Sequence, residues 1–113
     1  MEKVFWQSLD TLIKEHTIII DRPRGTAHPR YPDTLYPLDY GYLAGTHSGD
    51  DGGIDVWIGS LVERSISAVV ITADLKKKEV EIKLLLGCNA EEQQIVLQMH
   101  QRGMQSALLI ERP

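Results

Sequence analysis

Four of the five prolines of this 113-residue chain lie within residues 22–39. Proline has no backbone N–H to donate and restricts the residue before it, so helices and strands end where prolines cluster. Long connections in small chains are often functional loops, whether ordered or disordered. We therefore expect regular structure on both sides of this segment and functional residues close to it.

The spacing of apolar residues predicts the flanking elements. Apolar side chains recur at helical intervals over residues 2–15, which indicates an amphipathic helix. Residues 17–20 are β-branched and predict a short buried strand. Further strands are expected, in chain order, at residues 41–44, 54–58, 66–72, 79–86 and 107–110. The strands at 66–72 and 79–86 are close enough in sequence to form a hairpin.

A second helix is predicted after the hairpin. Asn89 is a favourable N-cap, Glu92 completes a capping-box pattern, and Gly103 marks the end of the helical segment. The chain is therefore mainly β, with five or six short strands and two helices. We expect an antiparallel β-barrel with a flanking N-terminal helix and a flanking C-terminal helix, and an α+β sandwich is the alternative. At this length the barrel is one domain spanning residues 1–113.

Composition excludes several classes of partner. The chain has 16 acidic and 12 Lys or Arg residues, a formal charge of −4, which argues against a nucleic-acid binder. Its aromatic content of 6% argues against single-strand binding by base stacking. No secretion signal or membrane-spanning stretch is visible, so no membrane partner is expected. Cys88 stands alone, which is typical of a reducing compartment, and we expect a cytoplasmic protein.

Carboxylates gather in a glycine-rich segment. Asp50 and Asp51 are separated from Asp55 by a segment containing Gly52 and Gly53, which allows these carboxylates to turn towards one point. Hard oxygen ligands arranged in this way suit Mg²⁺ or Mn²⁺. A solvated Asp-Gly turn has the same composition and is the competing interpretation.

Two motifs in this region resemble those of the soluble family I inorganic pyrophosphatases. The first motif reads Tyr36-Pro37-Leu38-Asp39-Tyr40-Gly41-Tyr42. The second begins at Asp50, ten residues after Tyr40, and closes with Asp55-Val56. The resemblance implies an OB-like β-barrel, Mg²⁺ dependence, and hydrolysis of pyrophosphate or a related phosphoanhydride to phosphate. Because members of the family often assemble as dimers or hexamers, it also implies a homo-oligomer.

The resemblance assigns roles to particular residues. It implies four metal ligands, namely Asp50, Asp55, Asp74 and Glu81. It implies that substrate phosphate contacts Tyr36, Tyr40 and Lys83. A strand carrying Glu79, Glu81 and Lys83 on one face has a simpler interpretation as a solvent-exposed face.

The basic part of the proline-rich segment adds one more candidate. Arg30 lies there, and a guanidinium binds phosphate through two parallel hydrogen bonds, so Arg30 is a candidate substrate-binding residue. A solvated loop with ordinary surface charges is the competing interpretation.

Several positions depart from the family pattern. Gly52 replaces the middle aspartate of the signature, which in the family helps to activate the attacking water, and Gly53 replaces its proline. The early strand carries Thr17 and Ile19 where the family has a lysine and a glutamate. The tyrosine–lysine pair near the second helix falls on His100 and Gln101 or close by, so part of the phosphate-binding shell is lost.

Two functional hypotheses follow. In the first, the chain is a phosphoanhydride hydrolase with Asp51 and Asp55 as its catalytic carboxylates, although side chains at adjacent extended positions point to opposite sides. In the second, it is a catalytically impaired relative that binds metal and a phosphorylated small molecule in a regulatory role.

Overall fold

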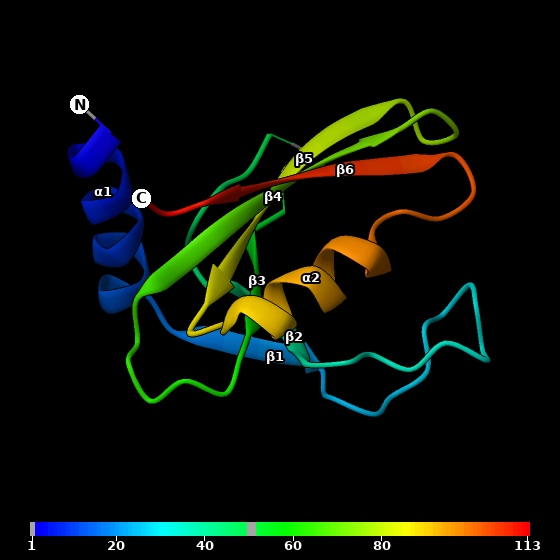
Figure 1. Ribbon diagram of the computed structural model, residues 1–113, viewed down its shortest axis with the longest axis horizontal. Coiled ribbons are helices and arrows are strands. Elements are labelled where there is room, and N and C mark those ends of the chain that lie inside the picture. Colours follow the sequence, from blue (N-terminus) through cyan, green and yellow to red (C-terminus); the bar gives the residue numbers. More distant parts are fainter. Residues whose placement is uncertain (1, 50–51) are drawn as a thin grey trace.

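The computed structural model describes residues 2–49 and 52–113, which form two helices and six strands (Figure 1). In chain order these are α1 (Glu2–Glu15), β1 (Ile18–Arg22), β2 (Asp39–Leu43), β3 (Ile54–Ile58), β4 (Ile66–Asp74), β5 (Glu79–Leu86), α2 (Ala90–Met99) and β6 (Gln105–Glu111). Neither helix of this part of the chain is long and apolar enough to cross a membrane.

The six strands make one mixed sheet in the order β1-β2-β3-β5-β4-β6. All neighbouring pairs are antiparallel except β3 and β5. The parallel pair arises because the chain passes from β3 to β4, two positions along the sheet, and returns through a hairpin as β5 between them. The expected mainly β, OB-like fold with two flanking helices is confirmed, but the sheet is mixed and open, not a closed antiparallel barrel.

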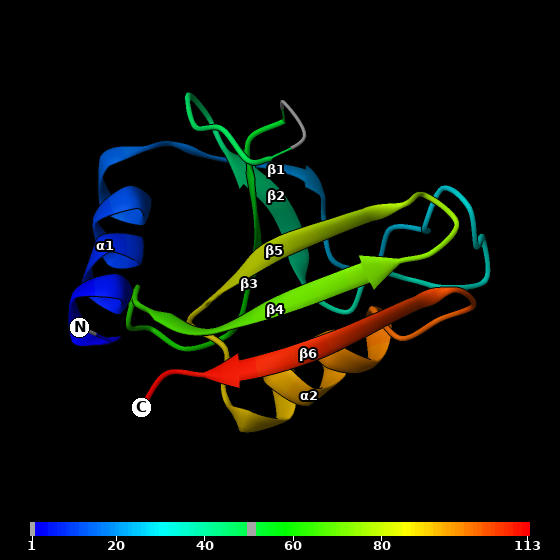
Figure 2. The same ribbon diagram turned by 90° about the horizontal axis from the view of Figure 1, so that it is seen from above.

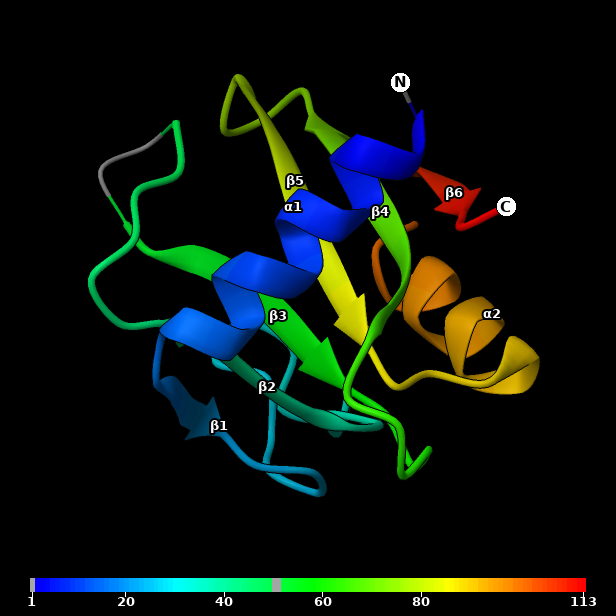
Figure 3. The ribbon, with the colours of Figure 1, turned by 90° about the vertical axis from the view of Figure 1, so that its left-hand side faces the viewer.

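Each helix packs on a different face of the sheet. Alternate strand residues point to opposite faces, so neighbours such as Val56 and Trp57 enter different cores. The core under α1 contains Trp6, Leu9, Ile13, Leu43, Val56, Ile66, Val69, Leu84 and Leu86. The core under α2 contains Tyr36, Leu38, Trp57, Ala68, Val70, Leu85, Cys88 and Val96. Figure 3 shows α1 lying across the strands with α2 beside them.

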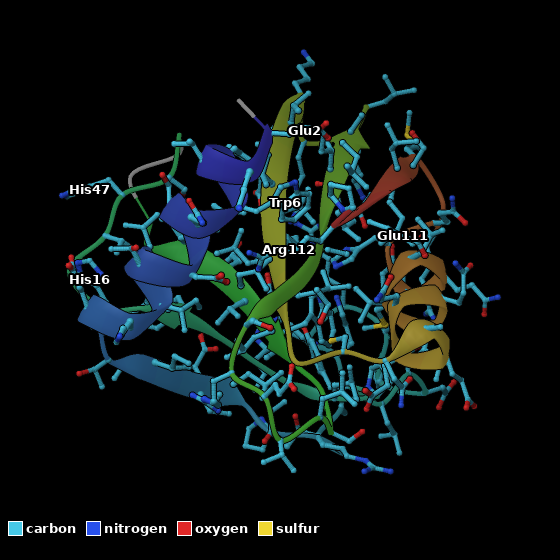
Figure 4. All side chains as sticks on the ribbon, turned by 60° about the vertical axis from the view of Figure 1, so that its left-hand side comes forward. Glu2, Trp6, His16, His47, Glu111 and Arg112 are labelled. Atoms are coloured by element: carbon cyan, nitrogen blue, oxygen red, sulfur yellow. The ribbon has the colours of Figure 1, made fainter. Side chains whose placement is uncertain are left out.

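Polar contacts fix where each helix lies. Asp10 of α1 accepts a hydrogen bond from the backbone N–H of Ile66 and forms an ion pair with Arg112. The guanidinium of Arg112 also lies over the Trp6 ring. Figure 4 shows Trp6 and Arg112 close together between the helix and the sheet. The predicted capping box of α2 is present, with Asn89 and Glu92 each accepting from the other's backbone N–H.

The proline-rich arm, residues 23–38, has more backbone order than proline content alone predicts. Its two limbs are joined by backbone hydrogen bonds, from Gly25 to Tyr36, from Tyr36 to Thr26 and from His28 to Thr34. None of the paired donors is a proline, so the prolines interrupt the ladder without preventing it. The arm is therefore an ordered hairpin-like loop. The preceding strand β1 is a half-exposed sheet edge, not the buried strand expected from its β-branched residues.

Gly41 allows β1 and β2 to approach each other. A Cβ at this position would overlap the backbone carbonyl oxygen of Ile19. We expect Gly41→Ala to lower the free energy of unfolding by about 3 kcal/mol or more, because the two strands must separate. Gly49→Ala is the matched control, since a Cβ there meets nothing within 4 Å. Urea denaturation of both variants checks this, and equal stabilities would contradict it.

Candidate functional site

A cavity of about 520 Å³ opens on the α2 side of the sheet. Its lining side chains come from all the strands of the sheet, from the proline-rich arm and from the segment that links α2 to β6. In Figure 1 the arm and this linking segment both extend towards the same end of the molecule, beyond α2. The cavity therefore brings together residues that are far apart in sequence.

Lys83 is the central charged residue of this cavity. The residue is only 6% exposed, and its ammonium group donates to three oxygens. These are the hydroxyl of Tyr40 at 2.8 Å, Oδ2 of Asp55 at 3.0 Å and Oε2 of Glu81 at 2.9 Å. An ammonium group has three N–H bonds, so every donor of Lys83 is used. The two carboxylates offset the cost of burying the positive charge.

Strand pairing explains why these four side chains meet. Asp55 lies opposite Lys83 in the parallel β3–β5 pair. Glu81 precedes Lys83 by two residues on β5 and therefore shares its face. Tyr40 reaches the same face from β2, where the antiparallel pairing places it opposite Trp57, two residues beyond Asp55. The cluster thus depends on the register of three strands.

Burial and charge set the protonation states of the cluster. Burial by itself lowers the pKa of Lys83, but the contacts with Tyr40, Asp55 and Glu81 outweigh it, so the pKa of Lys83 lies above its ordinary value. Burial raises the pKa of the Tyr40 hydroxyl. At neutral pH the cavity therefore contains a charged ammonium and a neutral phenol.

A second cationic group, Arg22, enters the cavity from the end of β1. Its Nη1 donates to the Tyr36 hydroxyl at 2.6 Å, and its guanidinium lies 5.6 Å from the centre of the Tyr36 ring. The sequence indicated Arg30, and not Arg22, as the phosphate-binding candidate of this basic segment. The β1–β2 register shifts between Ile20 and Arg22, which brings Arg22 opposite Tyr40, and this irregularity leaves no visible sequence pattern.

Aromatic rings pack the base of the arm against β3. The ring of Tyr36 stacks on His28 and Tyr40, and Tyr40 lies 4.5 Å from Trp57 between ring centres. Tyr36 is only 4% exposed, so it holds the arm to the sheet as well as presenting its hydroxyl. Arg102, from the segment after α2, donates to Thr34 and lies over the Tyr31 ring. These contacts join the arm to the opposite wall of the cavity.

His100, one of the departures from the family pattern, is buried at the cavity wall. Its Nε2 accepts a hydrogen bond from the Trp57 indole N–H at 3.0 Å, so that nitrogen carries no proton. The other nitrogen, Nδ1, then donates to Oε1 of Gln105 at 3.3 Å. Burial and the nearby Lys83 charge lower the pKa of His100 to about 4. His100 is therefore a neutral structural contact of Trp57.

The structure brings seven of the predicted site residues to this one cavity, Arg30, Tyr36, Tyr40, Asp55, Asp74, Glu81 and Lys83. Their individual roles stay predictions. Asp50 and Asp51 lie outside the described residues. Lys83 is buried, so its strand face is not the solvent-exposed face of the simpler interpretation.

The described residues do not make a metal site by themselves. Among residues 2–49 and 52–113, no three or more Asp, Glu, His or Cys side chains are grouped to hold an ion. Asp55 and Glu81 both bind Lys83, and Oδ1 of Asp74 accepts from the backbone N–H groups of Lys76 and Lys77 in the β4–β5 turn. Carboxylate oxygens are suitable Mg²⁺ ligands, but a complete ion site would need more ligands than these described residues group together.

Solved inorganic pyrophosphatases share this fold. One from Helicobacter pylori superposes with a TM-score of 0.61 at 11% identity, covering 83% of this chain and 81% of that chain. An inorganic phosphatase of Anaplasma phagocytophilum gives 0.57 at 12% identity, over 83% and 81%. An inorganic pyrophosphatase of Neisseria gonorrhoeae gives 0.51 at 16% identity, over 86% and 75%. At the level of sequence, no family model and no curated protein matches.

These similarities assign the chain to a fold class. At identities of 11 to 16% the likeness establishes the fold and leaves the chemistry to the residues of this chain. The chain has the inorganic pyrophosphatase fold, with a cavity in which a buried lysine contacts two carboxylates and a tyrosine, beside an arginine–tyrosine pair.

The depressed pKa of His100 makes stability depend on pH. The folded-state pKa of about 4 lies below the ordinary value of 6.5, so between these values the unfolded chain binds a proton that the folded chain does not. The contribution of neutral His100 to the free energy of unfolding is complete above pH 6.5 and is lost as pH falls towards 4. We expect His100→Gln to lose less stability than the wild type over this range, by about 2 to 3 kcal/mol.

Urea denaturation at a series of pH values measures this difference. His47→Gln is the control, because His47 is exposed on the loop between β2 and β3 (Figure 4). Its curve should run parallel to that of the wild type. A His100→Gln curve that is also parallel to the wild type would contradict the assigned protonation state.

Proposed function

We propose that this chain is a divergent member of the inorganic pyrophosphatase family that hydrolyses pyrophosphate or a related phosphoanhydride. The observation that carries the proposal is the Lys83 cluster, in which a buried ammonium meets Tyr40, Asp55 and Glu81 on the fold of that family. A cavity with fixed cations and tyrosine hydroxyls suits the oxygens of a phosphoryl group.

The phosphate-binding side of the proposed site consists of cations and phenols. Arg22 and Arg30 both line the cavity and supply planar groups that match phosphate oxygens. Lys83 has no spare donor, so a phosphate oxygen that binds it must replace one of the three present acceptors. Substrate binding is therefore proposed to loosen the contact of Lys83 with one of its carboxylates.

The proposed Mg²⁺ site uses those same carboxylates. Asp55 and Glu81 would hold the ion with Asp50, and Asp74 lines the same cavity. Mn²⁺ has similar ligand preferences and is a possible substitute. Bound Mg²⁺ supplies charge neutralisation and lowers the pKa of a coordinated water. Ligation of Asp55 or Glu81 would withdraw an acceptor from Lys83, so metal and phosphate binding at this cluster are expected to support each other.

The proposed catalytic carboxylates are Asp55 and Asp51. With Gly52 at the position of the middle aspartate, Asp51 is the nearest residue of the signature that could accept a proton from water. Gly52 in place of the middle aspartate also favours a second candidate function, a catalytically impaired protein that binds metal and a phosphorylated small molecule. In that alternative the cavity has the same ligands but no fast turnover.

We also propose a domain organisation, a location, an assembly state and a range of partners. We infer a single domain over residues 1–113, a cytoplasmic location and assembly into a homo-oligomer, with no nucleic-acid or membrane partner. These inferences come from the composition and from the family resemblance.

Removal of the Lys83 ammonium tests the proposed site. We expect Lys83→Gln to reduce Mg²⁺-dependent release of phosphate from pyrophosphate by at least about 100-fold, because a fixed cation at the phosphoryl group is lost. Lys14→Gln is the matched control, since Lys14 is exposed in the last turn of α1. Circular dichroism confirms that both variants are folded. Equal rates in the wild type and Lys83→Gln would overturn this assignment.

Restoration of the middle carboxylate separates the two candidate functions. If Gly52 limits water activation, Gly52→Asp should raise the rate of pyrophosphate hydrolysis by at least about 10-fold, since a positioned base contributes this much or more. Gly49→Asp adds the same charge to the same loop and should not raise it. A wild-type rate that already matches a fast enzyme would reject the binding-protein alternative. No hydrolysis in any of these proteins would reject the hydrolase.

A further inference from the structure

The cavity extends well beyond the Lys83 cluster. Lys83 lies four residues from Glu79, where β5 begins, so at about 3.3 Å per residue the β4–β5 turn starts about 13 Å from it along the strand. Lys76 and Lys77 of that turn nevertheless line the same cavity. Its volume of about 520 Å³ is typical of pockets that enclose drug-sized ligands, which are much larger than pyrophosphate. A pyrophosphate bound at Lys83 would therefore leave the far part of the cavity unfilled.

Three segments of the chain line this far part, which we call the outer end. They are the proline-rich arm, the β4–β5 turn and the segment that links α2 to β6. Figure 2 shows all three at the end of the molecule that lies away from α1. Each segment contributes at least one exposed cation to the lining of the cavity, and together these are Arg30, Lys76, Lys77 and Arg102. Positive charge therefore reaches the outer end from three separate parts of the chain.

Carboxylates neutralise little of this charge. In the part of the chain that the structure describes, Arg30, Lys76 and Arg102 form no ion pair. Lys77 lies 3.8 Å from Glu79, but their side chains are 44% and 34% exposed, so this pair contributes little. The outer end therefore presents positive charge to any anion that enters the cavity.

The pKa of His28, on the proline-rich arm, reflects the same positive charge. Burial of the imidazole lowers this pKa below its ordinary value. Four cations lower it further, namely Arg22, Arg102, Lys77 and Arg30. His28 is therefore neutral at neutral pH and adds no charge of its own. Since cations from all three segments act on one imidazole, they share one region of positive potential.

We propose that the cavity binds a linear triphosphate, with two phosphoryl groups at Lys83 and Arg22 and the third among the cations of the outer end. This inference rests on the proposed function, because it requires the phosphate site at Lys83. Ammonium and guanidinium groups form charge-assisted hydrogen bonds with phosphate oxygens, and Thr34 takes one of the five N–H donors of Arg102. A triphosphate chain occurs free, as inorganic tripolyphosphate, and in nucleoside triphosphates. Both carry the third phosphate that the outer end would bind.

Calorimetric titration of the full chain with two imido analogues tests this proposal, since their nitrogen bridges resist hydrolysis. Diimidotriphosphate has three phosphoryl groups and imidodiphosphate has two. With Mg²⁺ present, the wild type should bind diimidotriphosphate at least about 10-fold more tightly, because the third phosphate gains charge-assisted hydrogen bonds. The β,γ-imido analogue of ATP carries the same chain on a nucleoside, so the tighter binder of the two triphosphates identifies the source of the ligand.

Charge-removing variants locate the third phosphate. Lys76→Gln and Arg102→Gln, on two different segments, should each lower the preference for diimidotriphosphate over imidodiphosphate by at least about 5-fold. Lys78→Gln is the matched control, because Lys78 is exposed in the same turn but is not part of the cavity lining. It removes the same charge and should keep the wild-type preference. Circular dichroism reports whether each variant is folded, and Lys76→Gln keeps the contact between Arg102 and Thr34.

The outcomes separate this inference from the proposed function. Binding of imidodiphosphate without a preference for either triphosphate would overturn the outer end as a phosphate site and leave the proposed function standing. Absence of binding by all three analogues would overturn both. A preference that Lys78→Gln lowers as much as Lys76→Gln would also overturn the inference, because overall charge and not the outer end would then explain it.

Discussion

The buried ammonium of Lys83 is the interaction on which the site depends. A charge that is only 6% exposed requires compensation, and three strands supply it through Tyr40, Asp55 and Glu81. Those contacts hold only while β2, β3 and β5 keep their register, because a shift by one residue would turn these side chains to the other face. The charge interactions in the cavity therefore depend on the same strand pairing that defines the sheet.

Local sequence patterns predicted much of this fold. The alternation in residues 79–86, the hairpin and the Asn89–Glu92 capping box all appear in the structure, because each depends on neighbouring residues. The parallel pairing of β3 with β5 was not predicted, since it depends on a chain crossing that no local pattern records. Arg22 was missed for a related reason, because a register shift in β1 directs it into the cavity.

The departures from the family pattern have a consistent physical result. His100 is a neutral partner of Trp57, so the position contributes packing instead of a charged phosphate contact. Ile19 lies half-exposed on the edge strand and offers no polar group. Lys83, Arg22 and Arg30 line one cavity, together with Lys76, Lys77 and Arg102. Because Ile19 and His100 supply no charge, the proposed site depends on these cations, with Lys83 at its centre.

Calorimetric titration with imidodiphosphate, a pyrophosphate analogue with a nitrogen bridge, tests most directly whether the Lys83 cavity binds pyrophosphate, because it needs no turnover. We expect binding of one analogue per chain in the presence of Mg²⁺, weaker binding without the metal, and loss of binding in Lys83→Met. Absence of binding to the wild type at millimolar analogue, or equal binding to wild type and Lys83→Met, would contradict it.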